Sequence, residues 1–236
     1  MSILAEKVAT LRRRLLDALL PQDCLLCLAP AGGDLLCAAC AAGLPQLPPA
    51  RCPRCAQPAA GGAVCGRCQR QPPHFDALLA LHPYAFPIDG LIQRLKYGSE
   101  LAVAAHFGAA LADACRGLDA DLIVPMPLHP ARLAERGFNQ AMEITRALSR
   151  GLGVPVAAHA CVRAKRTSPQ EGLSPNERRR NLRNAFSCAG DFADRHLLLV
   201  DDVATTGASA DECARTLKRH GAGRVSVAVV ARTLLD

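Results

Sequence analysis

The chain has no tryptophan, and only 3% of its 236 residues are aromatic. Any hydrophobic core must therefore be built from aliphatic side chains. Hydrophobic residues make up 50% of the chain and charged residues 21%, which excludes a disordered chain and allows one full domain plus a smaller one. No uninterrupted apolar run approaches the roughly 18 residues of a membrane-spanning helix.

The first 20 residues lack the features of an export signal. Glu6, Lys7 and the arginines at 12–14 interrupt the apolar residues, and no small-residue cleavage site follows. Apolar residues at spacings of three and four predict an amphipathic helix over 3–19 instead. We expect this helix to pack on the protein without inserting into a membrane, and we expect a cytoplasmic location.

Eight of the twelve cysteines form four C-x-x-C pairs. The pairs are Cys24/Cys27, Cys37/Cys40, Cys52/Cys55 and Cys65/Cys68. Moving the first four positions by 28 residues reproduces the last four, so the segment is a tandem repeat of C-x2-C-x9-C-x2-C. Two cysteines separated by two residues can direct both thiolates to one metal ion, and two such pairs complete a tetrahedral sulfur shell.

We interpret this repeat as two structural Zn2+ sites. The segment is rich in Pro, Gly and Ala and could hardly fold without metal. A disulfide framework would require export, and redox C-x-x-C pairs are the other alternative. Pairing within each repeat is the simplest assignment, and pairing across repeats stays open. With eight thiolates and two zinc ions, the formal charge falls from +7 to about +3, which argues against a strong general nucleic-acid binder.

After a linker at 71–75, strand and helix patterns alternate. We therefore expect an N-terminal helix (1–22), a double zinc ribbon (23–70) and an α/β domain (71–236) with a parallel sheet flanked by helices. The strands are expected at 76–86, 121–127, 154–162, 184–188, 196–202 and 224–234, and the strand at 121–127 is expected to lead into a proline-rich turn. The helices are expected at 88–98, 101–117, 137–153 and 207–221. Ligands of such sheets bind at the carboxyl ends of the strands.

One strand end has the composition of an anion site. The apolar run 197–200 leads into Asp201 and Asp202, then into small and hydroxyl residues before a helix begins. Free backbone N–H groups and the helix dipole suit a terminal phosphate at that position. Two carboxylates beside it suit sugar hydroxyls. No Lys follows Gly207, which excludes a P-loop, so we predict a ribose 5-phosphate site.

Residues 197–209, LLLVDDVATTGAS, resemble the phosphoribosyl-pyrophosphate (PRPP) motif of type I phosphoribosyltransferases. The resemblance implies that Asp201 and Asp202 hold the ribose hydroxyls. It implies that the turn after them wraps the 5′-phosphate, through Thr205, Thr206, Gly207, Ala208 and Ser209. Ala208 and Ser209 stand where many members have Gly and Thr.

Residues 124–140, VPMPLHPARLAERGFNQ, and the later ERRRN-x-x-x-AF (177–186) resemble the ComF/ComFC competence proteins, including GntX-like members. That family joins a small N-terminal zinc-ribbon module, with four cysteines per zinc, to a type I phosphoribosyltransferase-like domain. The resemblance places Arg136 and Gly137 at the pyrophosphate loop. It also makes 163–180 a flexible loop over PRPP, with Arg163 and Lys165 neutralising pyrophosphate and Mg2+ bound with PRPP. From the residues alone, the basic stretch 163–183 is a cationic loop for anions, and a solvated helix face around 176–183 is the alternative.

Three functions remain open. The first is PRPP-dependent transfer to an unknown acceptor with pyrophosphate release, in which Asp201, Asp202, Arg163 and Lys165 act. The second is PRPP sensing without catalysis in DNA uptake. The third is an adaptor that binds single-stranded DNA or a partner such as a helicase. Lys96 and Tyr97 match a family position without an evident role, and His129 is interpreted as structural. Four further cysteines are interpreted as small buried hydrophobic residues: Cys115, Cys161, Cys188 and Cys213.

Overall fold

The computed structural model describes residues 22–164 and 182–235. The chain divides into one unit that ends at Pro45 and a second that begins at Gln46. The division falls between the two cysteine repeats, so the second repeat belongs to the same unit as the α/β domain. The helix expected over 3–19 lies outside the described residues. None of the helices in the described ranges is long and apolar enough to cross a membrane.

The two cysteine repeats have the same local structure. A short helix follows the third cysteine of each repeat, α2 (Ala38–Ala42) in the first and α3 (Gly66–Arg70) in the second. These bounds differ by the 28 residues that separate the repeats in sequence. The 3-10 turn η1 (Ala60–Gly62) lies between the two pairs of the second repeat. The sequence repeat is therefore also a structural repeat.

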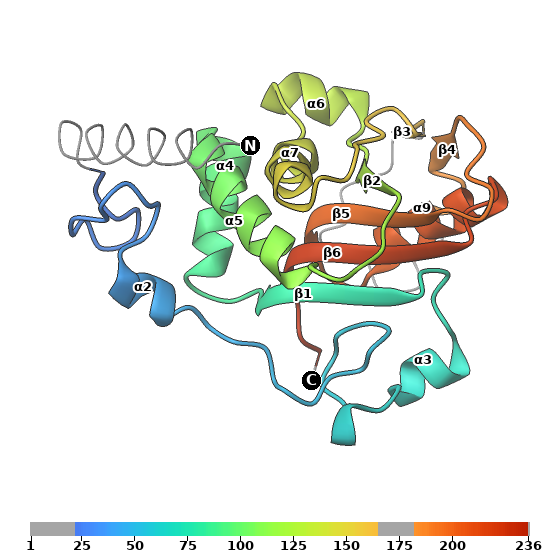
Figure 1. Ribbon diagram of the computed structural model, residues 1–236, viewed down its shortest axis with the longest axis horizontal. Helices are drawn as coiled ribbons and strands as arrows, with labels where there is room; N and C mark the ends of the chain where they lie inside the picture. Colours follow the sequence, from blue (N-terminus) through green and yellow to red (C-terminus); the bar gives the residue numbers. More distant parts are fainter. Residues whose placement is uncertain (1–21, 165–181, 236) are drawn as a thin grey trace, which may run out of the picture. The chain divides into compact units, whose positions relative to one another are not determined.

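The larger unit is built around a four-stranded parallel sheet (Figure 1). Its strand order is β1 (Ala77–Pro83), β6 (Arg224–Arg232), β5 (His196–Ala204) and β2 (Leu122–Pro125). All three pairings are parallel. The two central strands, β5 and β6, are nearly fully buried, as expected of a parallel sheet covered on both faces.

Helices cover both faces of this sheet. On one side, α9 (Ala208–Arg219) packs through Cys213 and Leu217 against alternate strand residues such as Leu197 and Val227. The residues between them point to the other face, because side chains alternate along a strand. There α4 (Ile88–Gly98), α5 (Leu101–Ala114) and α7 (Gln140–Leu152) form the second layer.

Helices α5 and α7 approach each other closely where both carry small residues. A methyl group at Gly108 of α5 would lie 2.5 Å from the Cβ of Ala147 on α7. A methyl group at Gly151 of α7 would lie 2.5 Å from the Cβ of Ala112 on α5. These two glycines fix the distance between the helices.

Two expectations about the chain between β2 and β5 were wrong. The proline-rich segment after β2 contains a helix, α6 (Pro130–Arg136), which begins with proline and is capped by the ring of His129. This confirms the structural interpretation of His129. The strand expected at 154–162 is reduced to one parallel bridge, from Val156 to Ile123, followed by the short strand β3 (Cys161–Arg163).

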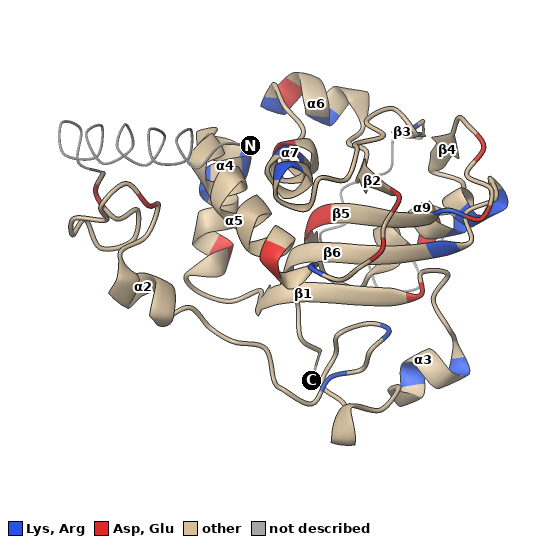
Figure 2. Ribbon diagram, in the orientation of Figure 1, with Lys and Arg blue, Asp and Glu red and all other residues tan. Residues whose placement is uncertain are grey.

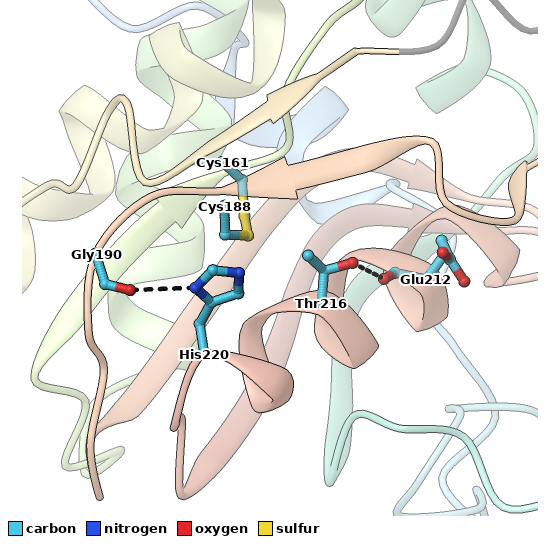
Figure 3. The surroundings of a disulfide bond; sticks show 6 residues. All are labelled: Cys161, Cys188, Gly190, Glu212, Thr216 and His220. Atoms are coloured by element: carbon cyan, nitrogen blue, oxygen red, sulfur yellow. Dashed lines mark hydrogen bonds between the residues drawn. A yellow bond between two sulfur atoms is a disulfide. The ribbon is translucent and has the colours of Figure 1, made fainter.

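Strand β3 pairs antiparallel with β4 (Phe186–Cys188), apart from the main sheet. Cys161 and Cys188 face each other in this pair and form a disulfide (Figure 3). Both residues are buried, as interpreted, but the sequence analysis did not foresee that they are bonded to each other. The imidazole of His220, at the end of α9, donates to the carbonyl of Gly190 nearby, at 3.3 Å. Cys161 and Cys188 flank the basic stretch 163–183, of which residues 165–181 lie outside the described ranges.

Candidate functional site

The eight repeat cysteines gather into two clusters, one in each repeat. In each cluster the four sulfur atoms lie within 4.8 Å of one another. Pairing therefore occurs within each repeat, and pairing across repeats is excluded. The clusters are Cys24, Cys27, Cys37 and Cys40, and Cys52, Cys55, Cys65 and Cys68.

The sulfur spacing fits tetrahedral zinc. Zn–S bonds of about 2.3 Å in a tetrahedron place neighbouring sulfurs about 3.8 Å apart. The sulfurs of Cys27 and Cys37 lie 3.7 Å apart, and those of Cys55 and Cys65 also lie 3.7 Å apart. Each cluster therefore has the ligands and the dimensions of a structural zinc site.

Backbone hydrogen bonds favour the thiolate form at the first cysteine of each cluster. Burial raises the pKa of Cys24, but hydrogen bonds from neighbouring backbone N–H groups outweigh it and lower this pKa to about 6. The same balance lowers the pKa of Cys52 to about 7. Because zinc binds thiolates, these backbone donors prepare both sites for the metal.

The acid pair lies at the carboxyl end of β5. Asp202 is only 3% exposed. One of its carboxylate oxygens forms an ion pair with the ammonium group of Lys96 on α4, and the other accepts a hydrogen bond from the side-chain amide of Gln140, at 3.2 Å. Asp201 is partly exposed, and its carboxylate accepts the backbone N–H of Asp202 at 2.9 Å.

The pKa values of the two carboxyl groups are shifted in opposite directions. Burial and the nearby charge of Asp202 raise the pKa of Asp201 well above its usual value. Burial would also raise the pKa of Asp202, but the Lys96 charge and several hydrogen bonds hold it below its usual value. The negative charge of the pair is therefore concentrated on Asp202, while Asp201 more readily keeps a proton.

The sequence RGFNQ (136–140) connects α6 to this acid pair. Gly137 ends α6 in the left-handed conformation, with φ of 81°. The side chain of Asn139 caps α7 and donates to the carbonyl of Met126 at 3.0 Å. Gln140 is 7% exposed and accepts a hydrogen bond from Arg136 at 2.5 Å while it donates to Asp202. The motif thus positions Arg136 relative to the acid pair.

The turn between β5 and α9 has the features of an anion site. Gly207 adopts φ of 80° immediately before α9, a conformation that favours glycine. The hydroxyl of Thr206 accepts the backbone N–H of Ala208 at 3.3 Å. A cavity of about 20 Å³ is lined by residues 201, 203–210 and Val229. The expected phosphate residues Thr205, Thr206, Gly207, Ala208 and Ser209 all line it. We call residues 205–209 the phosphate loop.

Basic side chains lie close to the acid pair. Arg163, at the end of β3, stacks over the ring of Phe186 with 5.8 Å to its centroid. Burial lowers the pKa of Arg163, although the negative charge of Asp201 acts to raise it. A second cavity, of about 220 Å³, lies beside Lys96. It is lined by Lys96, Tyr97, Ser99, Arg132, Glu135 and Arg136. Lys165 lies outside the described residues.

Sequence comparison supports both parts of this architecture. Residues 15–69 match the family model of a double zinc ribbon domain, and residues 133–234 match that of a phosphoribosyl transferase domain. Competence protein F of Haemophilus influenzae is 36% identical over 173 residues, which cover 69% of this chain and 76% of that protein. The chain belongs to the ComF family.

A second curated relative and one solved structure are also similar to parts of the chain. DNA utilization protein YhgH of Escherichia coli K12 is 37% identical over 172 residues, 70% of this chain and 76% of that protein. Among solved structures, the glutamine PRPP amidotransferase of B. subtilis aligns with a TM-score of 0.39 and 17% identity. That alignment covers 53% of this chain and 25% of the amidotransferase chain.

Sequence reasoning missed the residues that support the acid pair. Lys96 and Gln140 contact Asp202 from α4 and α7, 106 and 62 residues away in the chain. The sequence LKYG around Lys96 suggests no role by itself. The structure supplies that role, because Lys96 balances the charge of Asp202.

Proposed function

We propose that this ComF-family protein binds PRPP at the carboxyl end of β5 and transfers its phosphoribosyl group to an acceptor. One observation carries the proposal: the acid pair lies directly beside a helix-capping phosphate loop, with Lys96 paired to Asp202 and Arg163 in the electrostatic field of Asp201. Asp201 and Asp202 would accept the ribose hydroxyls. Residues 205–209 would surround the 5′-phosphate with N–H groups and hydroxyls.

In the proposed reaction the bond between C1 of the ribose and the pyrophosphate oxygen breaks. A bond from C1 to the acceptor forms, the acceptor loses a proton, and pyrophosphate leaves with the electron pair. C1 gains positive charge in the transition state, and Mg2+ arrives with the substrate and binds largely through it. Arg163 and Lys165 would stabilise the departing negative charge, and Arg136 and Gly137 would belong to the loop that binds the pyrophosphate.

The proposal is tested by calorimetric titration of the zinc-loaded protein with PRPP, with and without Mg2+. The variant Asp202→Asn should lose binding while its fold is kept, because the amide replaces one acceptor oxygen and the negative charge that we propose for the ribose hydroxyls. Asp113→Asn is the matched control, since Asp113 is exposed on α5 and pairs only with its neighbour Arg116 among the described residues. Equal affinity of both variants would remove the ribose assignment.

Turnover is a separate question from binding. If the protein binds PRPP, release of pyrophosphate in the presence of candidate amines and nucleobases would demonstrate transfer. PRPP binding without pyrophosphate release in the presence of any of these acceptors would favour PRPP sensing without catalysis.

A second candidate function is a role in DNA uptake, which the names of the relatives, a competence protein and a DNA utilization protein, favour. Single-stranded DNA or another uptake protein such as a helicase would then be the partner. The two repeats differ in charge: the charged residues of 22–45 are two aspartates, and those of 46–73 are four arginines. Figure 2 shows basic residues on α3 and on the segment that leads to it.

Salt dependence tests the DNA candidate. Phosphate contacts release counterions, so affinity for single-stranded DNA should fall steeply as salt increases. Replacing Arg51 and Arg54 by Ala should weaken binding and flatten this dependence, whereas Arg116→Ala, in the turn that follows α5, should change neither. Binding that is unaffected by the double substitution would exclude the second repeat as the DNA-binding surface.

A further inference from the structure

The side chain of Arg232 lies between the second cysteine cluster and the phosphate loop. Arg232 is the last residue of β6, and only 1% of it is exposed. Its Nε donates to the carbonyl of Cys55 at 2.9 Å. Its Nη1 donates to the carbonyl of Ala204 at 2.7 Å and also to that of Thr205. One guanidinium thus joins a metal-binding cysteine to the end of β5 and the first residue of the phosphate loop.

Other side chains of the second repeat make parallel contacts. Arg67, on α3, donates to the carbonyl of Thr206 at 3.2 Å. Gln57 is 7% exposed, donates to the carbonyl of Thr233 at 2.8 Å and accepts the backbone N–H of Leu235 at 3.0 Å. The second repeat therefore holds both the phosphate loop and the segment that follows β6.

These contacts fix the orientation of the backbone in the phosphate loop. A trans peptide unit is planar, and its C=O and N–H groups point in opposite directions. The carbonyls of residues 204, 205 and 206 are bound by Arg232 and Arg67 on the side of the second repeat. The N–H groups of residues 205, 206 and 207 therefore point away from that repeat, as an anion-binding loop requires.

The buried charge of Arg232 depends on the metal cluster. The hydrogen-bond acceptors of Arg232 are neutral carbonyls, and none of the ion pairs in the described part of the chain includes it. Zn2+ bound by four thiolates has a formal charge of −2, which supplies the counter-charge that a buried cation needs.

We propose that the second zinc site positions the phosphate loop through Arg232, so that zinc occupancy at this site and PRPP binding are linked. The linkage rests on the proposed function, whereas the positioning of the loop does not. The first repeat has a different composition at the contact positions. Ala29 and Ala39 stand 28 residues before Gln57 and Arg67. The linkage should therefore be specific to the second cluster.

The first arm of the test measures hydrogen exchange at the amides of residues 205–208 in the full-length, zinc-loaded protein without PRPP. Cys68→Ser removes a ligand of the second zinc and should speed this exchange by about fivefold or more. A fivefold change is at the lower end of the effects that coupled binding sites usually have on each other. Cys40→Ser is the matched control, because it occupies the equivalent position of the first cluster. Equal loop exchange in the two variants would overturn the proposal.

Arg232 is tested in the same way. Arg232→Gln should speed exchange of the loop amides, whereas Arg224→Gln, at the exposed start of the same strand, should not. If Arg232→Gln fails to fold by circular dichroism, Arg67→Ala takes its place, with Arg70→Ala on the same helix as control. An unchanged loop in the folded variant would contradict the assigned role.

The second arm measures how fast a chelator removes each zinc ion, with and without PRPP and Mg2+. PRPP should slow the release of one ion by about fivefold or more, because linkage between two sites is reciprocal. That ion should be the one missing from Cys68→Ser, and Arg232→Gln should abolish the slowing. PRPP that binds but slows neither ion, or both equally, would overturn the linkage. Absence of PRPP binding would reject the proposed function, and the exchange arm would still decide whether the loop is positioned by zinc.

Discussion

Lys96 and Asp202 form an ion pair between the last turn of α4 and the carboxyl end of β5. The pair joins the layer of helices to the strand that ends in the acid pair. It leaves Asp202 ionised although this carboxylate is buried. The site therefore presents one stable negative charge where we propose that ribose hydroxyls bind.

Removing the charge of Lys96 should shift the pH dependence of PRPP binding. The pKa of Asp202 is depressed, so the stability that this group contributes is present above its unfolded pKa and is lost as the pH falls through its folded value. In Lys96→Met the pKa of Asp202 rises, so both stability and PRPP affinity should be lost at a higher pH than in the wild type. Titrations across a pH series measure the shift. If PRPP affinity falls at the same acidic pH in both proteins, the assigned role of Lys96 is contradicted.

Gln140 should contribute to stability through its two charged partners. Gln140→Leu leaves Arg136 without this acceptor and Asp202 without this donor, which should lower the free energy of unfolding by about 1–3 kcal/mol. Urea denaturation measures the change. Gln93→Leu, at an exposed position on α4, is the control and should have little effect. A similar stability of both variants would show that the bridge between Arg136 and Asp202 is not significant.

The disulfide between Cys161 and Cys188 can be detected directly. Peptide mapping without reductant should recover the two cysteines in one linked peptide, and reduction should separate them. Cys161→Ser should lower the free energy of unfolding by about 2–4 kcal/mol, because the bond closes a loop in the unfolded chain. Free thiols at both positions in the purified, unreduced protein would contradict the bond.

The contact between α5 and α7 should be sensitive to a single methyl group. Gly108→Ala places a Cβ 2.5 Å from Ala147, so the helices must separate, at a cost of about 1–3 kcal/mol. Gly90→Ala on α4 is the matched control. Its Cβ meets no atom within 4 Å, and alanine should stabilise the helix by about 0.5–1 kcal/mol. Thermal unfolding of the two variants should therefore change in opposite directions.

Local patterns were sufficient to predict the zinc clusters and the strand that ends in the acid pair. A shift of 28 residues reveals the repeat, and each cluster forms within one repeat. Helix α6 was missed because Pro130 was interpreted as part of a turn. Proline is common at the first position of a helix, and His129 before it provides the cap.

Contacts between distant parts of the chain could not be predicted from such patterns. Cys161 and Cys188 are 27 residues apart and have no spacing motif, so only the pairing of β3 with β4 reveals the bond. Arg232 has the sequence context of an ordinary strand end. Its function becomes visible only when the second repeat packs against that end of β6.

The central claim is that PRPP binds with its 5′-phosphate in the phosphate loop and its ribose on Asp201 and Asp202. A crystal structure of the zinc-loaded protein with PRPP and Mg2+ tests it most directly. We expect the 5′-phosphate within hydrogen-bonding distance of the amides of residues 206–209, with both ribose hydroxyls at the acid pair. Another cavity, of about 460 Å³, is lined in part by Arg183, Arg215 and Arg219. PRPP bound in that cavity, with the phosphate loop unoccupied, would contradict the claim.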